Sequence, residues 1–335
     1  MANFSTFWIA IVLSINTAMA GNKVDDNFSI SGVIETEAAV GKNYEADYYS
    51  QAGVAKIEIA ALSQVSQSID ATFVFQFENE SSENGKLDKA FVTLKQIFPS
   101  FNLAVGRLYL YETFFSSDMV TDAITQELTE LRMEGMSLQF HQQNTYVNFS
   151  LYKSPLASEF DHKAEFVVDF SHTIPIANQQ LIVQGLYTSN IVDSQHLAEL
   201  VDTPVSKHTP AIGFSLSLQS DRLSLMSQCV GVTETIDRNI LTYNEQSAKP
   251  FACQLEASRS FNILQGTWLS LGYQWSEQAF SLGYPVNKWM MAAKWQPRSN
   301  LELALELARS QDYARDVGGA GSADNALTAQ MAVEF

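Results

Sequence analysis

Apolar and polar residues alternate along many short segments of this sequence. In the segment 301–308, leucine stands at every odd position and glutamate or alanine at every even one. The segments 69–78, 209–218, 267–275 and 288–296 repeat the alternation, with large apolar side chains on one face and mainly small or polar ones on the other. A period of two over about ten residues is typical of a β-strand whose two faces meet different surroundings. The alternation predicts an all-β chain.

Two architectures contain such strands: a soluble sandwich, and a membrane barrel with lipid outside and water inside. The residue types favour the barrel, because aromatic side chains often stand at the ends of a segment, as Trp289 and Trp295 do. Aromatic residues at both ends of a span suit the two interfaces of a bilayer. The segment 300–309 also fits a short amphipathic helix, although its neighbours favour a strand.

About sixteen such segments can be counted, and the connections between them alternate between short and long. The expected strands are 28–40, 52–63, 69–78, 88–97, 101–110, 131–140, 145–153, 162–171, 179–188, 209–218, 222–232, 250–258, 267–275, 288–296, 300–309 and 326–335. Short turns at one end and long loops at the other are the layout of an outer-membrane barrel with both termini periplasmic. We therefore expect residues 21–335 to form one transmembrane antiparallel β-barrel.

The two ends of the chain agree with this expectation. Residues 1–20 hold an apolar stretch too short to span a bilayer and end in Ala18-Met19-Ala20, which predicts a cleaved signal peptide; the alternative is a buried N-terminal helix. The terminal Phe335 on an alternating segment resembles the signal read by the bacterial barrel-assembly machinery. We expect the cell outer membrane, with its lipid and lipopolysaccharide, as the surroundings of the chain.

Composition excludes several classes of protein. The net charge of −17 disfavours nucleic acid as a partner. The five histidines are scattered, and the sequence holds no H-E-x-x-H or G-x-S-x-G motif, so we expect no enzyme, no cofactor and no resident metal.

Two cysteines are too few for a disulfide scaffold or a four-ligand zinc site. Cys229 and Cys253 nevertheless fall on consecutive expected strands, and residue 241 is the midpoint both of the pair and of the loop 233–249. We expect them to be opposed on the lipid side, with α-carbons roughly 4.5–5.5 Å apart.

The segment 106–132 interrupts the alternation after the fifth expected strand. In sixteen-stranded porins the loop at this place typically folds back into the lumen and narrows it. We therefore expect 111–130 to be a constriction loop. A short helix capped by Asp118 or Thr121 would run to about Leu128. Its apolar residues Met119, Ile124 and Leu128 would pack on the barrel wall.

The same segment resembles the most recognisable stretch of the LbtU-type siderophore porins. The matching residues are Gly106, Arg107, Tyr109, Phe114, Met119, Val120, Asp122, Thr125, Glu127, Leu128, Glu130, Arg132 and Glu134. The sequence departs from the family at residues 111–113, where Pro-Phe-Gly is usual, and at Asp118, Ala123 and Thr129. The resemblance implies a barrel without a plug domain that admits a ferric siderophore. The architecture fits a general or sugar-selective diffusion porin equally well, and a structural or adhesive surface protein is a third alternative.

The candidate selectivity residues lie on this loop and at its roots, because rings of charge at a narrow point select solutes electrostatically. They are Arg107, Tyr109, Phe114, Asp118, Asp122, Glu127, Glu130 and Arg132. Alternatively, the two arginines pair with loop acids and fix the loop to the wall.

Several acids with inward parity make the lumen acidic, which would disfavour a polycarboxylate anion. They are Glu35, Glu37, Glu58, Glu302 and Glu306. Expected partners are a ferric siderophore or another small solute, and the chain could form a homo-oligomer.

Overall fold

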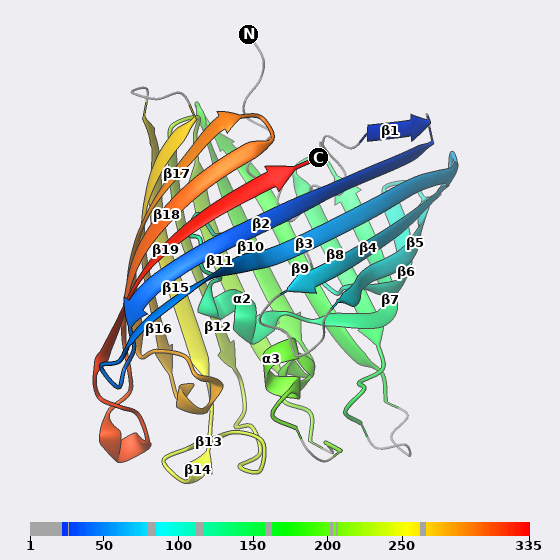
Figure 1. The fold of residues 1–335 in the computed structure, drawn as a ribbon. Helices are drawn as coiled ribbons and strands as arrows, with labels where there is room; N and C mark the ends of the chain where they lie inside the picture. The colour runs from blue at the N-terminus through cyan, green and yellow to red at the C-terminus, as the bar shows by residue number, and fades with distance from the viewer. Residues whose placement is uncertain are drawn as a thin grey trace.

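A single closed antiparallel barrel makes up nearly all of the computed structural model (Figure 1). The structure describes residues 22–25, 27–78, 85–111, 117–157, 163–201, 204–205, 207–261 and 266–335. The expected signal peptide and Phe114 lie outside the described residues.

Sixteen strands form the ring, as expected, each pairing with its two neighbours. They are β2 (Phe28–Lys42), β3 (Tyr48–Ser66), β4 (Ile69–Glu78), β5 (Lys86–Phe98), β6 (Phe101–Tyr109), β7 (Arg132–Gln142), β8 (Thr145–Tyr152), β9 (Glu165–Ile176), β10 (Gln179–Thr188), β11 (Ala211–Gln219), β12 (Leu223–Val232), β15 (Phe251–Phe261), β16 (Thr267–Glu277), β17 (Asn287–Arg298), β18 (Leu301–Gln311) and β19 (Ala323–Glu334). Each overlaps one expected strand, and the segment 300–309 is a strand, not a helix. The largest difference from the expected bounds is in β9, whose expected end is residue 171 and which instead ends at Ile176. Pro175 does not end the strand earlier, because proline is tolerated near the end of a strand, beside the turn.

Short elements complete the fold. The strand β1 (Asn22–Asp25) pairs with β2, and β13 (Thr242–Tyr243) pairs with β14 (Gln246–Ser247) in a loop. Helices α2 (Ile124–Thr129) and α3 (Gln195–Ala198) lie inside the barrel outline, and the 3-10 turns η2 (Ile191–Asp193), η3 (Phe280–Leu282) and η4 (Arg315–Val317) lie in loops. No helix in the described part of the chain is long and apolar enough to cross a membrane.

The ring closes where the last strand pairs with the first. β19 lies antiparallel to β2, and Phe335 continues the pairing with Gly32: each backbone N–H donates to the other residue's carbonyl, at 2.9 and 3.0 Å. Gly32 has no side chain, and a Cβ there would lie 2.5 Å from the Phe335 ring. A closed ring leaves no unpaired strand edge, which is what allows β-structure to cross a bilayer.

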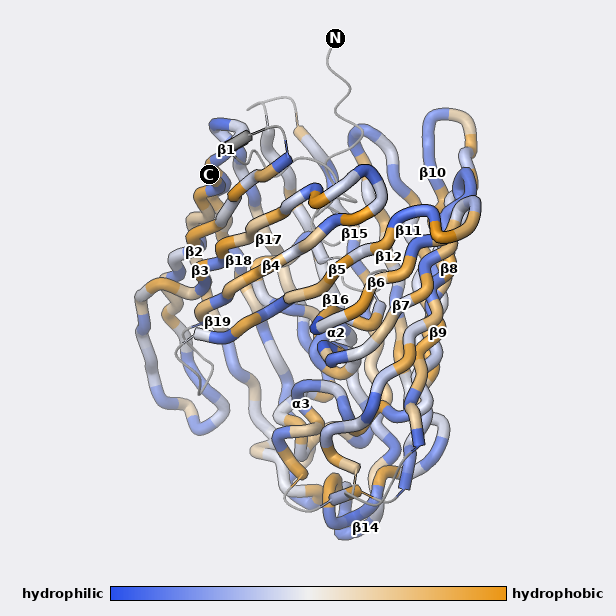
Figure 2. The backbone as a smooth tube through the Cα atoms, turned by 90° about the vertical axis from the view of Figure 1, so that its right-hand side faces the viewer, coloured by the Kyte–Doolittle hydropathy of each residue, from blue (hydrophilic) through white to orange (hydrophobic). Residues whose placement is uncertain are grey.

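Hydrophilic and hydrophobic residues alternate along the strands (Figure 2), and the two faces of the barrel wall differ as this alternation predicts. Large apolar side chains are exposed on the outside; Leu271 is 60% and Trp289 is 61% accessible. The inner face of the wall carries polar side chains such as Gln228, Gln254 and Gln274, which loops cover almost completely. An apolar exterior around a polar interior is the arrangement of a membrane barrel and excludes the sandwich.

The loops sort by side, as expected. Turns of two residues, such as 99–100 and 143–144, lie at the end of the barrel where the chain terminates. The long loops lie at the other end. We name four of them L3 (110–131), L5 (189–210), L6 (233–250) and L7 (278–286).

The two cysteines are opposed on neighbouring strands, as the midpoint argument predicts. Cys229 on β12 pairs with Cys253 on β15, and their sulfurs form a disulfide. Their α-carbons are 4.1 Å apart, slightly closer than expected. Both have the parity of Leu225 and Leu255, which are exposed on the barrel exterior.

Replacing both cysteines by serine should destabilise the barrel without preventing its formation, because the two strands are already joined by a hydrogen-bond ladder. Closing the loop between them is worth about 2–4 kcal/mol. Urea unfolding of Cys229→Ser/Cys253→Ser in lipid vesicles should show a lower free energy of unfolding and retained heat-modifiable mobility. Alkylation of both thiols in the untreated wild-type protein would contradict the pairing.

Candidate functional site: a loop across the barrel lumen

L3 crosses the inside of the barrel. It leaves β6 and returns to β7, which are the fifth and sixth strands of the ring. Its described residues contact β15, β16, β17 and β18, which are the twelfth to fifteenth. The two groups of strands lie about half a turn of the ring apart. L3 therefore spans the lumen and meets the opposite wall, as expected for a constriction loop.

Two carboxylates of that opposite wall hold the tip of L3. Glu256 on β15 accepts hydrogen bonds from the Ser117 hydroxyl at 2.6 Å and from the Asp118 backbone N–H at 2.8 Å. Glu256 also accepts a hydrogen bond from the amide of Gln254, on the same strand. Carboxylates that accept backbone N–H groups make stronger hydrogen bonds than neutral acceptors do.

Glu306 on β18 is the second of these carboxylates. It accepts hydrogen bonds from the backbone N–H groups of Val120 at 2.6 Å and Thr121 at 3.2 Å, and from the Thr121 hydroxyl at 2.7 Å. The ammonium of Lys288 on β17 donates to the same hydroxyl at 2.8 Å. Glu306 is 1% accessible, so the loop tip covers it.

Apolar packing supports these hydrogen bonds. Met119 packs against Met290 and Ala292 of β17. Ile124 and Leu128 of α2 join a buried cluster to which L5, L6 and L7 also contribute. The expected packing of Met119, Ile124 and Leu128 is therefore confirmed. The loops fill the lumen on the side of β12 and β15.

The expected helix is shorter than predicted and starts differently. α2 begins at Ile124 after Ala123, and neither Asp118 nor Thr121 caps it. The Thr121 hydroxyl is engaged by Glu306 and Lys288, so it is not free to cap. Gln274 of β16 supplies an acceptor instead: its side-chain oxygen lies 3.4 Å from the Ile124 N–H, one of the donors that a helix start leaves open.

Arg132 and Tyr109 form a polar cluster where L3 joins the wall. Arg132 pairs with Asp88 of β5, and the two side chains are only 7% and 2% accessible. The Tyr109 hydroxyl donates to Glu130 at 3.0 Å. The ammonium of Lys89 lies 4.8 Å from the centre of the Tyr109 ring. The ion pair of Arg132 is therefore with a wall acid, Asp88, although its charge also acts on the loop acid Glu130.

Arg107 is separate from this cluster. It lies opposite Ala90 on β5 and Glu134 on β7, and no ion pair joins it to another described residue. Gly106 before it has φ +140°, and a Cβ there would lie 2.3 Å from the carbonyl oxygen of Ala90. Gly106 is one of the residues that match the siderophore porins. The structure explains why a glycine stands there, because only glycine fits this conformation without strain.

The remaining loop acids lie on different sides of L3. Asp122 is exposed and lies near enough to Glu35 of β2 for their charges to repel. Burial raises the pKa of Glu130, and the nearby acids Asp122 and Glu78 raise it further, although Tyr109 and Arg132 lower it. Glu127 lies near L7: burial raises the pKa of Tyr284 well above its usual value, and the charges of Glu127 and Glu130 add to this effect.

The wall that faces Asp122 is acidic, as the parity of β2 and β3 predicts. Lys56 pairs with Glu58 at 3.3 Å, and it lies opposite Glu35. Glu37 accepts a hydrogen bond from Gln330 of β19 at 2.7 Å. The acids Glu35, Glu37 and Glu58 therefore outnumber the single cation Lys56 on this part of the wall.

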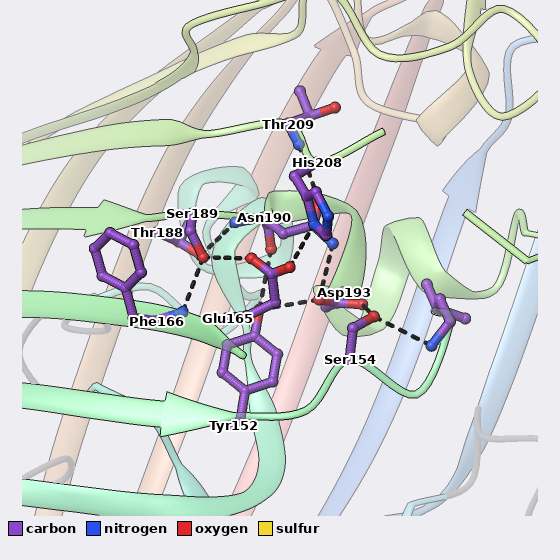
Figure 3. A network of polar contacts seen from close by, with 11 residues as sticks. Tyr152, Ser154, Glu165, Phe166, Thr188, Ser189, Asn190, Asp193, His208 and Thr209 are labelled. Carbon is purple, nitrogen blue, oxygen red and sulfur yellow. Dashed lines mark hydrogen bonds and ion pairs between the residues drawn. The ribbon is translucent and has the colours of Figure 1, made fainter. Parts of the chain in front are cut away.

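L5 is fixed to the wall by a polar network near the long-loop end (Figure 3). Asp193 accepts hydrogen bonds from the hydroxyls of Tyr152 at 3.0 Å and Ser154 at 2.5 Å. Glu165 of β9 pairs with His208. Burial raises the pKa of Asp193, and its hydrogen-bond donors oppose that shift. Among the described residues, no group of three or more His, Cys, Asp or Glu side chains is placed to hold a metal ion.

No known protein family profile matches the sequence. A curated relative, the "UPF0422 protein" of Coxiella burnetii, is 21% identical over 336 residues, which cover 91% of this chain and 71% of the relative.

Solved structures share the fold. OprB of Pseudomonas putida is 10% identical, with a TM-score of 0.66 over 92% of this chain and 94% of its own. The anion-selective porin of Comamonas acidovorans is 11% identical, with a TM-score of 0.66 over 92% and 99%. The outer-membrane channel DcaP of Acinetobacter baumannii is 12% identical, with a TM-score of 0.62 over 94% and 99%. The chain therefore has the fold of outer-membrane porins.

Replacing Glu306 by alanine should release the tip of L3, because the Val120 and Thr121 N–H groups lose their acceptor. A buried unsatisfied group costs about 1–3 kcal/mol, so exchange of these two amides with deuterium should accelerate about tenfold or more. Glu302→Ala is the matched control: Glu302 has the same inward parity on β18 but pairs only loosely with Lys294, at 3.7 Å. Equal exchange in Glu306→Ala and wild type would contradict the anchoring role.

Proposed function

We propose that this chain is a diffusion channel of the bacterial outer membrane in which L3 forms the constriction. The observation that carries the proposal is the path of L3 from β6 and β7 to Glu256 and Glu306 on the opposite wall. An ordered loop across the lumen narrows the barrel, and it does so without a separate plug domain. Solutes then pass between L3 and the wall formed by β19, β2 and β3.

The membrane location rests on the outer surface and on the sorting of the loops. A contiguous apolar exterior of this size needs a lipid or protein neighbour. Short turns on one side and long loops on the other fit a periplasmic and an outer face, respectively. The expected signal peptide and recognition of Phe335 by the barrel-assembly machinery remain predictions, and both fit this location.

The channel should prefer cations over anions. Asp122 on L3 and Glu35 on β2 are close enough to repel one another, and the acids around them outnumber the cations. A narrow passage lined by one sign of charge attracts counter-ions and excludes ions of like charge. Selection of this kind requires no tight binding, because the solute must also leave.

The variant Asp122→Asn/Glu35→Gln should have a smaller ratio of potassium to chloride permeability than the wild type, because charge is lost on both sides of the passage. Reversal potentials in planar bilayers under a potassium chloride gradient measure this ratio. Asp316→Asn is the control, since Asp316 is exposed in the loop 312–322 at the rim. An anion-selective wild-type channel would refute the cation preference.

Lower pH should also weaken the cation preference. The raised pKa of Glu130 means that this carboxyl binds a proton at a higher pH than an ordinary glutamate does. As pH falls toward the ordinary value of 4.5, Glu130 becomes neutral before an ordinary glutamate would, and the root of L3 loses negative charge. Glu130→Gln should have lower selectivity at neutral pH and a smaller loss of selectivity between neutral pH and about pH 5. A Glu130→Gln channel that loses as much selectivity as the wild type would contradict this assignment.

A ferric siderophore is the second candidate solute, and the resemblance at 106–134 is the observation that favours it. Arg107 and Arg132, two of the candidate selectivity residues, are not placed to bind one siderophore carboxylate together, because Arg132 is buried against Asp88. An acidic passage suits a neutral or cationic ferric complex better than a polycarboxylate anion. We therefore propose a neutral or cationic siderophore for this alternative.

Uptake measurements in a deletion strain separate the two candidates. Loss of uptake of a radio-iron-loaded trihydroxamate siderophore, with normal sugar uptake, would support the siderophore channel. Loss of small-sugar diffusion alone would support the general channel. Normal uptake of both would favour a structural or adhesive protein.

A further inference from the structure

A row of aromatic, cationic and polar residues crosses the outer face of the barrel close to the long-loop end. Its five members are directly opposed on neighbouring strands, from β17 through β18, β19 and β2 to β3, which lie side by side at the front of Figure 1. In order around the barrel they are Trp289, Arg309, Asn325, Lys42 and Tyr48. We call them the outer cation row. An aromatic residue stands at each end, and two cations lie between.

These side chains face away from the lumen. Trp289 is 61% and Tyr48 is 85% accessible. Arg309 and Asn325 line a groove of about 540 Å³ together with outward-facing apolar residues. The ammonium of Lys42 lies 5.7 Å from the centre of the Tyr48 ring, which places Lys42 on the same face.

The next outward row, two residues further from the long loops, is apolar. Met291, Leu307, Leu327 and Val40 are opposed in register, and all four line the same groove. Two residues along a strand cover about 7 Å, so the cations lie one side-chain layer above a hydrocarbon-like surface. This order, charge at the rim and apolar side chains beneath it, matches the headgroup and chains of a lipid.

The two cations have no counter-ion within the part of the protein that the structure describes. Among the described residues, neither Arg309 nor Lys42 lies within 4 Å of a carboxylate. Most of the charge of this chain is negative, so two cations in one register row on the outer face, neither of them paired with a described carboxylate, are unusual for this chain. A cation beside the apolar part of a membrane is costly unless an anion accompanies it.

We propose that the outer cation row binds the phosphate-bearing headgroup of a glycolipid in the leaflet at the long-loop end, and that its acyl chains lie in the groove below. Arg309 and Lys42 are two strands apart, about 10 Å, which suits a headgroup with two phosphates. The planar guanidinium of Arg309 matches phosphate geometry, and Trp289 and Tyr48 suit the interface on either side. The proposal rests on the outer-membrane location but not on what passes through the lumen.

The test uses the purified full-length mature barrel in detergent and diphosphoryl lipid A as the probe, with native mass spectrometry as the readout. Arg309→Gln/Lys42→Gln should bind lipid A about tenfold or more weakly than the wild type, because two charge-assisted contacts are lost. The exchange Arg309→Lys/Lys42→Arg should retain most of the binding. Arg259→Gln is the matched control, because Arg259 also has outward parity, beside Phe261 near the short-turn end.

Three results would overturn the proposal. The first is that Arg309→Gln/Lys42→Gln binds lipid A as strongly as the wild type does. The second is that Arg259→Gln loses as much lipid A binding as the double variant does. The third is that the wild type binds fully dephosphorylated lipid A as strongly as diphosphoryl lipid A. A change of oligomeric mass in the double variant, without a change in lipid binding, would assign the row to a second copy of the chain. Single-channel conductance should be unchanged in the double variant, so failure of this proposal is distinguishable from failure of the proposed channel.

Discussion

A loop that enters the lumen of a closed barrel must find partners there for its backbone, because the strands already use their own hydrogen-bonding groups for each other. Glu256 and Glu306 supply these partners for the tip of L3, and Gln274 receives the first N–H of α2. Both glutamates come from the far wall. The position of L3, and with it the division of the lumen, therefore depends on two acids that the loop covers.

Division of the lumen gives its two halves different roles. On one side, α2 packs with L5, L6 and L7 into an apolar cluster that contains Ile124 and Leu128. On the other side, Asp122 faces the acids of β2 and β3. The packed cluster supports the loop from one side, and the acidic wall on the other side is the part of the lumen along which we propose that solutes pass. The barrel exterior is a third environment, in which Arg309 and Lys42 mark a place where the apolar surface is interrupted.

The sequence predicts the strands well because a barrel wall imposes a strict period of two, and each strand shows it locally. The opposition of the two cysteines could be predicted for the same reason, since antiparallel register around a loop places Cys229 opposite Cys253. The contacts of L3 with the far wall could not be predicted, because they join residues more than a hundred positions apart. Parity alone marks Glu256 as inward, as it does Glu306, but nothing local indicates that it would accept the Asp118 N–H. Asp88, the partner of Arg132, lies at an irregularity between β4 and β5, where parity is not a guide.

Spin labels across the lumen test most directly that L3 is held against the far wall. In a Cys229→Ser/Cys253→Ser background, labels at Asp122→Cys on L3 and Glu302→Cys on β18 would report their separation by pulsed electron resonance in liposomes. The anchored loop predicts one narrow, short distance distribution, which broadens and lengthens when Glu306→Ala is added. A broad, long distribution in the parent, unchanged by Glu306→Ala, would mean that L3 does not rest on that wall.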